Sequence, residues 1–445
     1  MDGDTVIRDF GLMVDDRVDD GMFRIDRSIY TDEAVFEVEM ENIFESSWIF
    51  LCHENQVARH GDYFATEMGR QPVFISRQQD GSVECFINAC SHRGALLTPL
   101  KQGNARVLTC RFHGWSYNCD GRCLQIKNQD TGFPEEGFDR SHFNLRPIAK
   151  VESYRGFVFG SLSEDVPTLA EHLGAAAKWI DLLANQSTDG LEVVPGSSTY
   201  MIRGNWKLQA ENGVDGYHVS TVHRVFANTI VNRQAKGGFT GMKKTEAGRI
   251  TGQVTSRGYN LGGGHMSICA RHTTPEVRPI YERRDELRAR LPEADVDWIL
   301  NRGRNLYLFP NMLLMDNPST QIRLMKPLAA NLVEVTVYCI APIGESKEAR
   351  TARLRKFEDF YLTAGMATSD DIAALEDCHD GSYAVASKWN EFNRGLSEMI
   401  EGGDEDAKTL GFEPVTTSMD WDHETLFHGM YRHWRKLMTN GIEQQ

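Results

Sequence analysis

Two short clusters of cysteine and histidine constrain this chain more than any other feature of its sequence. They lie in the stretch "CSHRGALLTPLKQGNARVLTCRFHGWSY", where one residue separates Cys90 from His92 and two residues separate Cys110 from His113. Seventeen residues lie between the clusters. Thiolate sulfur and imidazole nitrogen are ligands for zinc and for iron. The sequence therefore predicts two loops that meet around a metal, and the fold must bring those loops together.

The spacing of these ligands favours iron. Structural zinc sites with the same ligand types usually combine a C-x2-4-C knuckle with an H-x3-5-H pair, whereas each cluster here supplies one cysteine and one histidine. Two such loops can give both thiolates to one iron and both imidazoles to the other, which is the ligand set of a Rieske [2Fe–2S] centre. Gly94 and Gly114, each soon after a ligand histidine, permit tight turns. A zinc-stabilised scaffold is the alternative.

Composition narrows the class of protein. The 445 residues carry 48 basic and 63 acidic side chains, a formal net charge of −15, which argues against nucleic acid or an anionic membrane as a partner. The sequence has no long apolar run and no signal-like N-terminus. Nine cysteines in such a chain favour metal binding over disulfides. We therefore expect a cytoplasmic protein with two or three domains.

The segment around the clusters has the pattern of β-strands. "QPVFISRQQDGSVECFINA" reads as a strand, a turn at Asp80 and Gly81, and a second strand, which is a hairpin signal. "VESYRGFVFGSL" reads as a further strand rich in aromatic and β-branched residues. We therefore expect a small antiparallel β domain over residues 46–164, with the clusters at the tips of two loops.

A second group of metal-binding residue types follows in the larger remainder of the chain. "NWKLQAENGVDGYHVSTVH" contains Asp215, His218 and His223, and "MATSDDIAALEDCHDG" offers Asp370 and Asp371. Two histidines and one carboxylate form the facial triad of a mononuclear non-haem Fe(II) oxygenase, which leaves open positions for O2 or substrate. A zinc hydrolase could use similar ligands, but it would have no use for a redox cluster. The sequence therefore predicts a second, mononuclear iron.

The spacing of the two histidines has a geometric consequence. Residues three apart, such as Asp215 and His218, share one face of a helix. Residues five apart, such as His218 and His223, point about 140° from each other on a regular helix. For both imidazoles to reach one metal, the helix should break or widen between them, and a π-type turn would do it.

Together these motifs resemble the large (α) subunits of Rieske ring-hydroxylating oxygenases. The resemblance is carried by "INACSHRGALL", "CRFHGWSYNCDGR", "SYRGFVFGSL", "GNWKLQAENGVDGYHVSTVH" and "GMATSDD", which look like the benzoate, toluate and cumate branch. It extends from about "SIYTDEAVFEVEMENIFESSWIFLCHENQV" to near the C-terminus. It implies cis-dihydroxylation of an aromatic ring with O2 as co-substrate, in an α3β3 assembly with a small β subunit. No G-x-G-x-x-G motif follows a strand, so a separate NADH-dependent reductase, with or without a ferredoxin, is expected as electron donor.

The resemblance also assigns roles to individual residues. It implies four ligands for the [2Fe–2S] cluster: Cys90, His92, Cys110 and His113. It implies three ligands for the mononuclear iron, with the second aspartate of the pair as the carboxylate: His218, His223 and Asp371. Asp215 would connect the two centres across a subunit boundary, accepting a hydrogen bond from His113 of the adjacent chain and contacting His218 of its own chain.

The catalytic domain expected from the resemblance is a helix-grip fold over residues 1–45 and 165–445, which makes the chain an α+β protein. Strand character is found in "GLEVVPGSSTYMIRGNWKL", "NLYLFPNMLLMDN", "TQIRLMKPL" and "NLVEVTVYCIAPI". Helical character is found in "PTLAEHLGAAAKWIDLLANQ", "YERRDELRARL", "KEARTARLRKFEDFYLTAGM" and "WDHETLFHGMYRHWRKLMTNG".

The substrate is expected to be an aromatic carboxylate such as benzoate, toluate or p-cumate, held by an arginine, histidine or amide that the sequence does not identify. Proximity to the ligand motifs selects these pocket residues: Asn212, Gly213, Val219, Tyr361, Met366 and Ala367. Gly213 and Ala367 are small enough to leave room for a ring substituent. Two alternative functions remain open at this point: a monohydroxylase resembling salicylate hydroxylase, and a Rieske electron-transfer protein without oxygenase activity.

Overall fold

A computed structural model describes residues 9–134, 136–238 and 254–440 of the chain. Within those ranges no helix is both long enough and apolar enough to cross a membrane. The chain divides into two units, Met40–Leu169 and a larger one formed by Met1–Glu39 with Ala170–Gln445. Antiparallel sheets dominate both units, with helices in the larger one, so the expected α+β class is confirmed.

The smaller unit is built from three antiparallel sheets. Their strand orders are β6-β5-β4-β7, β10-β9-β8 and β11-β12-β3. The strands are β3 (Ile49–His53), β4 (Asp62–Met68), β5 (Gln71–Arg77), β6 (Val83–Ile87), β7 (Gln102–Asn104), β8 (Val107–Thr109), β9 (Ser116–Asn118), β10 (Cys123–Gln125), β11 (Lys150–Tyr154) and β12 (Phe157–Ser161). The short helical segments are η3 (Met40–Phe44), η4 (Glu54–Val57), α3 (Gln129–Gly132) and η5 (Arg140–Phe143).

Two hairpins of this unit test the sequence patterns. β5 pairs with β6 across the turn at Asp80 and Gly81, so the first expected hairpin is confirmed. The stretch read as one strand, "VESYRGFVFGSL", is instead the hairpin of β11 and β12. The chain reverses at Arg155 and Gly156, which both adopt positive φ, 54° and 88°. A two-residue turn of that hand matches the twist of its strands, but an arginine gives little sign of it.

The larger unit contains one long antiparallel sheet of ten strands. The order is β13-β20-β19-β18-β17-β16-β15-β23-β22, and β14 also pairs with β20. The strands are β13 (Leu191–Val193), β14 (Ser198–Ile202), β15 (Ser256–Gly262), β16 (His265–Arg271), β17 (Arg302–Leu308), β18 (Met312–Asp316), β19 (Thr320–Ala329), β20 (Leu332–Pro342), β22 (Ile400–Glu401) and β23 (Thr416–Ser418). A small sheet of β1 (Val14–Arg17), β2 (Met22–Asp26) and β21 (Trp389–Glu391) joins the start of the chain to a late segment.

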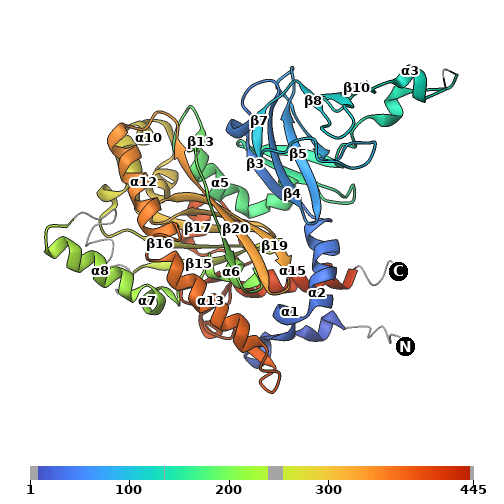
Figure 1. The fold of residues 1–445 in the computed structure, drawn as a ribbon. Helices are drawn as coiled ribbons and strands as arrows, with labels where there is room; N and C mark the ends of the chain where they lie inside the picture. Colours follow the sequence, from blue (N-terminus) through green and yellow to red (C-terminus); the bar gives the residue numbers. More distant parts are fainter. Residues whose placement is uncertain (1–8, 135, 239–253, 441–445) are drawn as a thin grey trace. The chain divides into compact units, whose positions relative to one another are not determined.

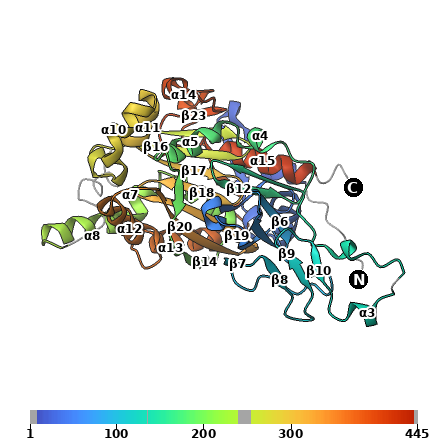
Figure 2. The same cartoon turned by 90° about the horizontal axis from the view of Figure 1, so that it is seen from above.

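Helices surround this long sheet (Figures 1 and 2). They are α1 (Ser28–Thr31), α2 (Glu33–Glu39), α4 (Leu169–Leu173), α5 (Ala177–Ala184), α6 (Trp206–Asn212), α7 (Val219–Val222), α8 (Arg224–Ala235), α10 (Arg284–Arg290), α11 (Glu293–Asn301), α12 (Lys347–Tyr361), α13 (Thr368–Ser382), α14 (Glu405–Leu410) and α15 (Phe427–Asn440). Helix α15 packs on β15 and β16, α6 on β19, and α12 on β19 and β20. All four segments with helical character contain helices, so those expectations are confirmed.

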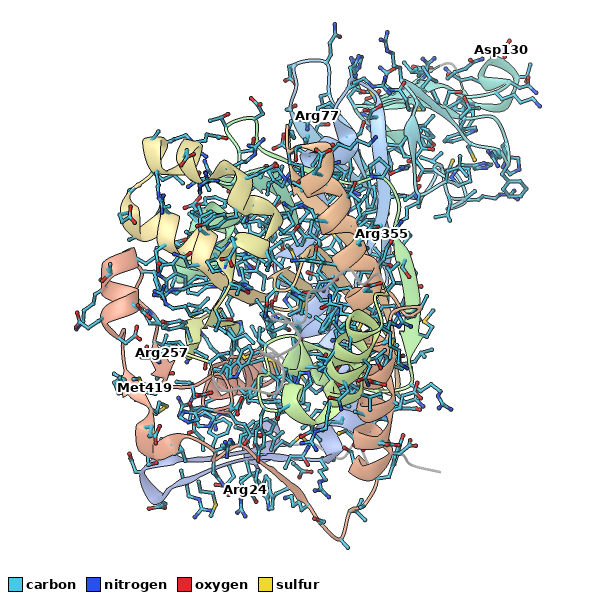
Figure 3. The ribbon with its side chains drawn as sticks, turned by 90° about the vertical axis from the view of Figure 1, so that its left-hand side faces the viewer. Arg24, Arg77, Asp130, Arg257, Arg355 and Met419 are labelled. Atoms are coloured by element: carbon cyan, nitrogen blue, oxygen red, sulfur yellow. The ribbon has the colours of Figure 1, made fainter. Side chains whose placement is uncertain are left out.

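Side chains fill the space between the sheet and its helices (Figure 3). Near the β23 edge, Arg257 of β15 donates from Nη1 to the carbonyl oxygen of Met419 over 3.1 Å and from Nε to Asp404 over 2.9 Å. One boundary differs from the sequence pattern, which continued strand character through Leu208 into α6. The strand ends at Ile202, because Asn205 accepts a hydrogen bond from the Lys207 backbone N–H and caps α6.

Candidate metal centres

The two cysteine–histidine loops of the smaller unit share one backbone pattern. The N–H of Gly94 donates to the carbonyl oxygen of Cys90, and the N–H of Gly114 donates to that of Cys110, both over 2.9 Å. Each glycine has a positive φ, 72° at Gly94 and 77° at Gly114. A side chain with a Cβ rarely adopts this conformation. The glycines therefore close two equivalent turns that present one cysteine and one histidine each.

The side chains of these loops converge. Cys90 and Cys110 are buried, and the ring centroids of His92 and His113 lie 4.6 Å apart. The buried Nδ1 of His113 has no hydrogen-bond partner in the described part of the chain, as suits a nitrogen that binds a metal. Tyr117 Oη lies 3.2 Å from Cys90 Sγ, within reach of a hydrogen bond to the sulfur. This donor set fits a Rieske cluster.

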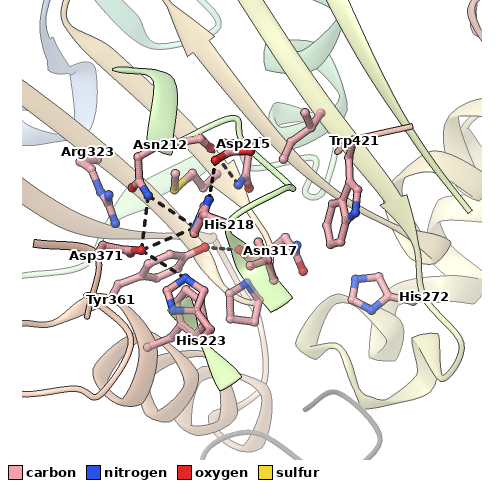
Figure 4. Close-up of a pocket in the computed structure, with 17 residues that line it drawn as sticks. Asn212, Asp215, His218, His223, His272, Asn317, Arg323, Tyr361, Asp371 and Trp421 are labelled. Atoms are coloured by element: carbon pink, nitrogen blue, oxygen red, sulfur yellow. Dashed lines mark hydrogen bonds and ion pairs between the residues drawn. The ribbon is translucent and has the colours of Figure 1, made fainter. Parts of the chain in front are cut away.

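A second centre forms in the larger unit where three elements meet. His218 precedes α7, His223 lies between α7 and α8, and Asp371 stands in the first turn of α13. Asp371 Oδ1 lies 3.5 Å from His218 Nε2 and 3.3 Å from His223 Nε2. The three ligand atoms all lie within 4.8 Å of one another (Figure 4). Two imidazoles and a carboxylate at this separation fit a ferrous iron.

The backbone between the two histidines breaks. Helix α7 ends at Val222, His223 has φ −91° and ψ 11°, and α8 begins at Arg224. The expected break is thus confirmed, but the suggested π-type turn is wrong. The N–H groups of Val222 and His223 still donate to His218 and Val219, as in an α-helix. The change of direction comes from the non-helical backbone at His223.

Asp215 is positioned to support one of the imidazoles. His218 Nδ1 lies 2.9 Å from Asp215 Oδ2, and Asp215 Oδ1 accepts a hydrogen bond from the backbone N–H of Tyr217 over 2.7 Å. Burial opposes protonation of His218, but the hydrogen bond and charge of Asp215 outweigh it and raise the pKa of His218. Burial lowers the pKa of His223. The network therefore assigns the His218 proton to Nδ1 and leaves Nε2 free to bind a metal.

A pocket opens beside these groups (Figure 4). Four of the expected pocket residues line it: Asn212, Gly213, Val219 and Tyr361. Asn212 Nδ2 donates to Asp371 Oδ1 over 3.3 Å, so its amide faces the triad. The lining also contains these residues that the sequence patterns did not indicate: Ile268, His272, Asn305, Met315, Asn317, Pro318, Arg323, Phe360 and Trp421.

The structure places two of the expected pocket residues elsewhere and gives another a different role. Met366 and Ala367 are not part of the lining, because they pack with Phe226 and other apolar residues of α8. Gly213 does line the pocket, but a Cβ there would lie 2.4 Å from the side chain of Leu313. Its small size therefore allows close packing on β18 rather than making room for a ring substituent.

Two protein families match the chain. The family described as "Rieske [2Fe-2S] domain" matches residues 47–154. The family described as "Ring hydroxylating alpha subunit (catalytic domain)" matches residues 191–440. The first range contains both cysteine–histidine loops, and the second contains the histidine–aspartate triad. A chain with these two domains carries a Rieske [2Fe–2S] cluster and a mononuclear iron as its cofactors.

Curated relatives match nearly the whole length of the chain. The 2-halobenzoate 1,2-dioxygenase large subunit of Burkholderia cepacia is 43% identical and covers 96% of this chain and 91% of its own. The toluate 1,2-dioxygenase subunit alpha of Pseudomonas putida is 41% identical and covers 97% and 95%. The anthranilate 1,2-dioxygenase large subunit of Acinetobacter baylyi is 38% identical and covers 97% and 93%.

Solved structures show the same fold. A naphthalene 1,2-dioxygenase with indole bound in its active site superposes with a TM-score of 0.81 at 24% identity, covering 94% of this chain and 92% of its own. The fold, the two family matches and the curated relatives agree. The chain therefore belongs to the α subunits of Rieske ring-hydroxylating dioxygenases, and it is an oxidoreductase that acts on aromatic rings.

Proposed function

We propose that this α subunit cis-dihydroxylates an aromatic carboxylate. The observation that carries the proposal is the convergence of His218, His223 and Asp371 at the wall of a pocket lined by aromatic residues. The printed names of the relatives, which act on 2-halobenzoate, toluate and anthranilate, support the choice of a ring with a carboxylate. Membership of the family excludes two of the alternatives, the electron carrier without oxygenase activity and the zinc scaffold.

The geometry supports the proposed ligands. His218, His223 and Asp371 hold the mononuclear iron, and Asp370 does not bind it. The [2Fe–2S] cluster is held by Cys90, His92, Cys110 and His113. The chemistry supplied at these sites is the activation of O2 on the ferrous iron with electrons delivered singly by the cluster.

The chain's own residues prepare the pocket for that chemistry. Asp215 holds the proton of His218 on Nδ1, so Nε2 stays directed at the triad. The amide of Asn212 donates to Asp371 and restrains that carboxylate. The rings of Phe360 and Tyr361 form an apolar wall that displaces water from around an aromatic substrate.

Electron transfer between neighbouring chains is part of the proposal. In an α3β3 assembly, Asp215 of one chain would accept a hydrogen bond from His113 of the next. Partial exposure of the Asp215 side chain, 24%, supports this. So do the exposed side chains of His92 and Phe112 at the tip of the cluster loops. A small β subunit and an NADH-dependent reductase, with or without a ferredoxin, complete the proposed system, and the nine unpaired cysteines support a reducing cytoplasm.

A substrate panel tests this proposal. The purified assembly, supplied with a reductase and NADH, is assayed with benzoate, toluates, p-cumate, anthranilate and salicylate. We expect at least one carboxylate to be converted with O2 uptake in step with its loss. Failure of every aromatic carboxylate, while a neutral arene is converted, would contradict the proposed substrate class. A monohydroxylated product would favour the salicylate hydroxylase-like alternative.

Subunit mixing tests the path between chains. Chains with a disrupted cluster, Cys110→Ser, are co-assembled with chains that lack the iron ligand, His223→Ala. Each kind of chain is inactive alone, but in a mixed ring one chain supplies the cluster and its neighbour supplies the iron. Recovered product formation supports the path between chains. Absence of recovery in assemblies verified to be mixed would place the electron path within one chain.

A further inference from the structure

Buried arginines divide into two groups in this structure. Five of the six buried arginines of the described chain lie within 4.0 Å of a carboxylate oxygen: Arg77, Arg278, Arg302, Arg304 and Arg353. The sixth, Arg323, is 2% exposed and has no such partner among the described residues. Burying a cation without a counter-charge is costly. The burial of an arginine without a nearby carboxylate therefore calls for a specific explanation.

The position of Arg323 supplies one. It lies on β19 and lines the pocket beside the histidine–aspartate triad. Figure 4 shows its guanidinium near Asp371 and Asn212, with no dashed line to any neighbour. Its buried Nε has no hydrogen-bond partner in the described part of the chain. Arg323 therefore lines the pocket, and no residue in the described part of the chain accepts a hydrogen bond from its Nε.

Contacts with neighbouring rings do not account for the burial. The guanidinium carbon lies 5.8 Å from the centroid of the Tyr361 ring, close to the limit of about 6 Å at which a cation–π interaction is useful. Burial raises the pKa of Tyr361, and the charge of Arg323 opposes that rise. The tyrosine therefore stays a neutral phenol and does not neutralise the arginine. No described carboxylate oxygen lies within 4.0 Å of the guanidinium, so an acidic group bound in the pocket would be its direct counter-charge.

We propose that Arg323 binds the carboxylate of the substrate and sets the preference of this enzyme for acidic rings. This inference rests on the proposed function, because it identifies the group that recognises the carboxylate. The planar guanidinium matches a carboxylate in a two-point hydrogen-bonded pair. Binding supplies the charge that the buried cation lacks, while the aromatic ring lies against the apolar wall of the pocket. A neutral ring would leave Arg323 unsatisfied, so the residue also acts against neutral substrates.

Equilibrium binding tests the role without relying on turnover. Benzoate binding to the oxidised holoenzyme is measured by calorimetry for the wild type and for Arg323→Met, Arg323→Gln and Arg323→Lys. We expect the Met and Gln variants to bind benzoate roughly 10- to 100-fold more weakly, which is the loss of one strong charge-assisted pair. The Lys variant should retain part of the affinity, because it keeps the charge but loses the planar fork.

Substrate preference is measured in the same variants. The ratio of kcat/KM for benzoate to that for toluene should fall by a similar factor in Arg323→Met. The value for toluene should fall much less than the value for benzoate, since toluene forms no ion pair with the guanidinium. A merely structural arginine would lower both values together.

Thermal stability provides the matched control. Arg353→Met removes a buried arginine that bonds Glu345 and Thr320, so its melting temperature should fall by several degrees. Arg323→Met removes an unpaired buried cation, so its melting temperature should stay the same or rise. A fall in Arg323→Met as large as that in Arg353→Met would show a structural role and overturn the inference.

The remaining outcomes separate this inference from the proposed function. If the wild type binds and converts benzoate or a related carboxylate, and Arg323→Met and Arg323→Gln do so equally well, the role of Arg323 is wrong and the function stands. If the wild type converts only neutral rings, the proposed substrate class and the role of Arg323 both fail.

Discussion

His218 keeps its proton on the side of the ring that faces away from the triad. Its Nδ1 lies 2.9 Å from Asp215 Oδ2, and its Nε2 lies 3.5 Å from Asp371 Oδ1. A neutral imidazole can bind a metal only through the nitrogen that lacks a proton. One carboxylate outside the triad therefore decides which nitrogen of His218 would be offered to a metal at the triad.

Replacing Asp215 should separate cluster reduction from product formation. Asp215→Asn keeps the size of the side chain and removes its charge, so both metal centres should still load. Product formation should fall about 10- to 100-fold, as is typical when a residue that supports a metal ligand is changed. Stopped-flow spectra should show the cluster reduced by its reductase at the normal rate. Normal turnover by this variant would remove Asp215 from the electron path.

The adjacent aspartates of α13 offer a matched pair of variants. Asp371→Ala removes an oxygen close to both imidazoles, so the mononuclear iron should be lost while the visible spectrum of the cluster stays intact. The loss of iron affinity should exceed the about 10- to 100-fold cost of changing a supporting residue. Asp370→Ala should retain the iron. Metal analysis showing equal loss in both variants, or loss only in Asp370→Ala, would contradict the assignment.

Sequence reasoning reaches some of the pocket residues and misses others for a physical reason. Asn212 and Val219 could be named because they adjoin the motif that contains His218. Arg323 could not, since β19 reaches the site only through its place in the sheet, between β18 and β20. Proximity in sequence to a ligand identifies the pocket residues that lie on the same element as that ligand. Pocket residues on other strands can be identified only when the order of the strands in the sheet is known.

At the scale of elements, the sequence predicts the presence of a strand or helix better than the residue at which it begins or ends. β19 and β20 are long, mostly apolar and buried, so their strand character is plain. The turn at Arg155 was missed because a residue other than glycine adopts a positive φ there. The start of α6 was missed because apolar residues lie on both sides of the cap at Asn205, with Ile202 before it and Trp206 after it. A turn or a helix cap depends on one or two residues, whereas a buried face repeats an apolar pattern along a whole element. Element boundaries are therefore harder to predict from sequence than the elements themselves.

A buried ion pair joins helices α2 and α6. Lys207 Nζ lies 2.5 Å from Glu39 Oε1, both side chains are fully buried, and the indoles of Trp206 and Trp434 also donate to the carboxylate of Glu39. α6 leads directly into the segment that carries Asp215 and His218. The pair therefore holds α6 in place, and α6 precedes the segment that carries His218.

Breaking this pair should destabilise the protein. Lys207→Met leaves the carboxylate of Glu39 buried without its cation, which should cost about 3–5 kcal/mol of unfolding free energy. The control is Lys388→Met, which breaks a pair with Asp26 at a lysine that is 52% exposed and should cost less than about 1 kcal/mol. Denaturant unfolding measures both. Equal losses in the two variants would show that the buried pair does not hold α6 in place.

At the scale of the whole molecule, the chain combines two redox sites with separate tasks. The loops of the smaller unit suit storage of one electron at a time, and the pocket of the larger unit suits an aromatic ring beside an iron. Neither task alone accounts for both motifs. Sequence reasoning reached this division and the α+β class because cysteine–histidine loops and a histidine–aspartate triad are specific for particular metals. It did not indicate Arg323, the residue proposed to bind a carboxylate.

The fate of dioxygen tests the central claim most directly. The purified assembly and its reductase are supplied with benzoate, or with the best carboxylate of the panel, under isotopically labelled dioxygen, and the product is analysed by mass spectrometry. We predict a ring diol that contains two labelled oxygen atoms, both from one dioxygen molecule when mixed isotopes are used. A product with a single labelled oxygen would contradict dihydroxylation, and the lack of any oxygenated ring product from a carboxylate would contradict the account as a whole.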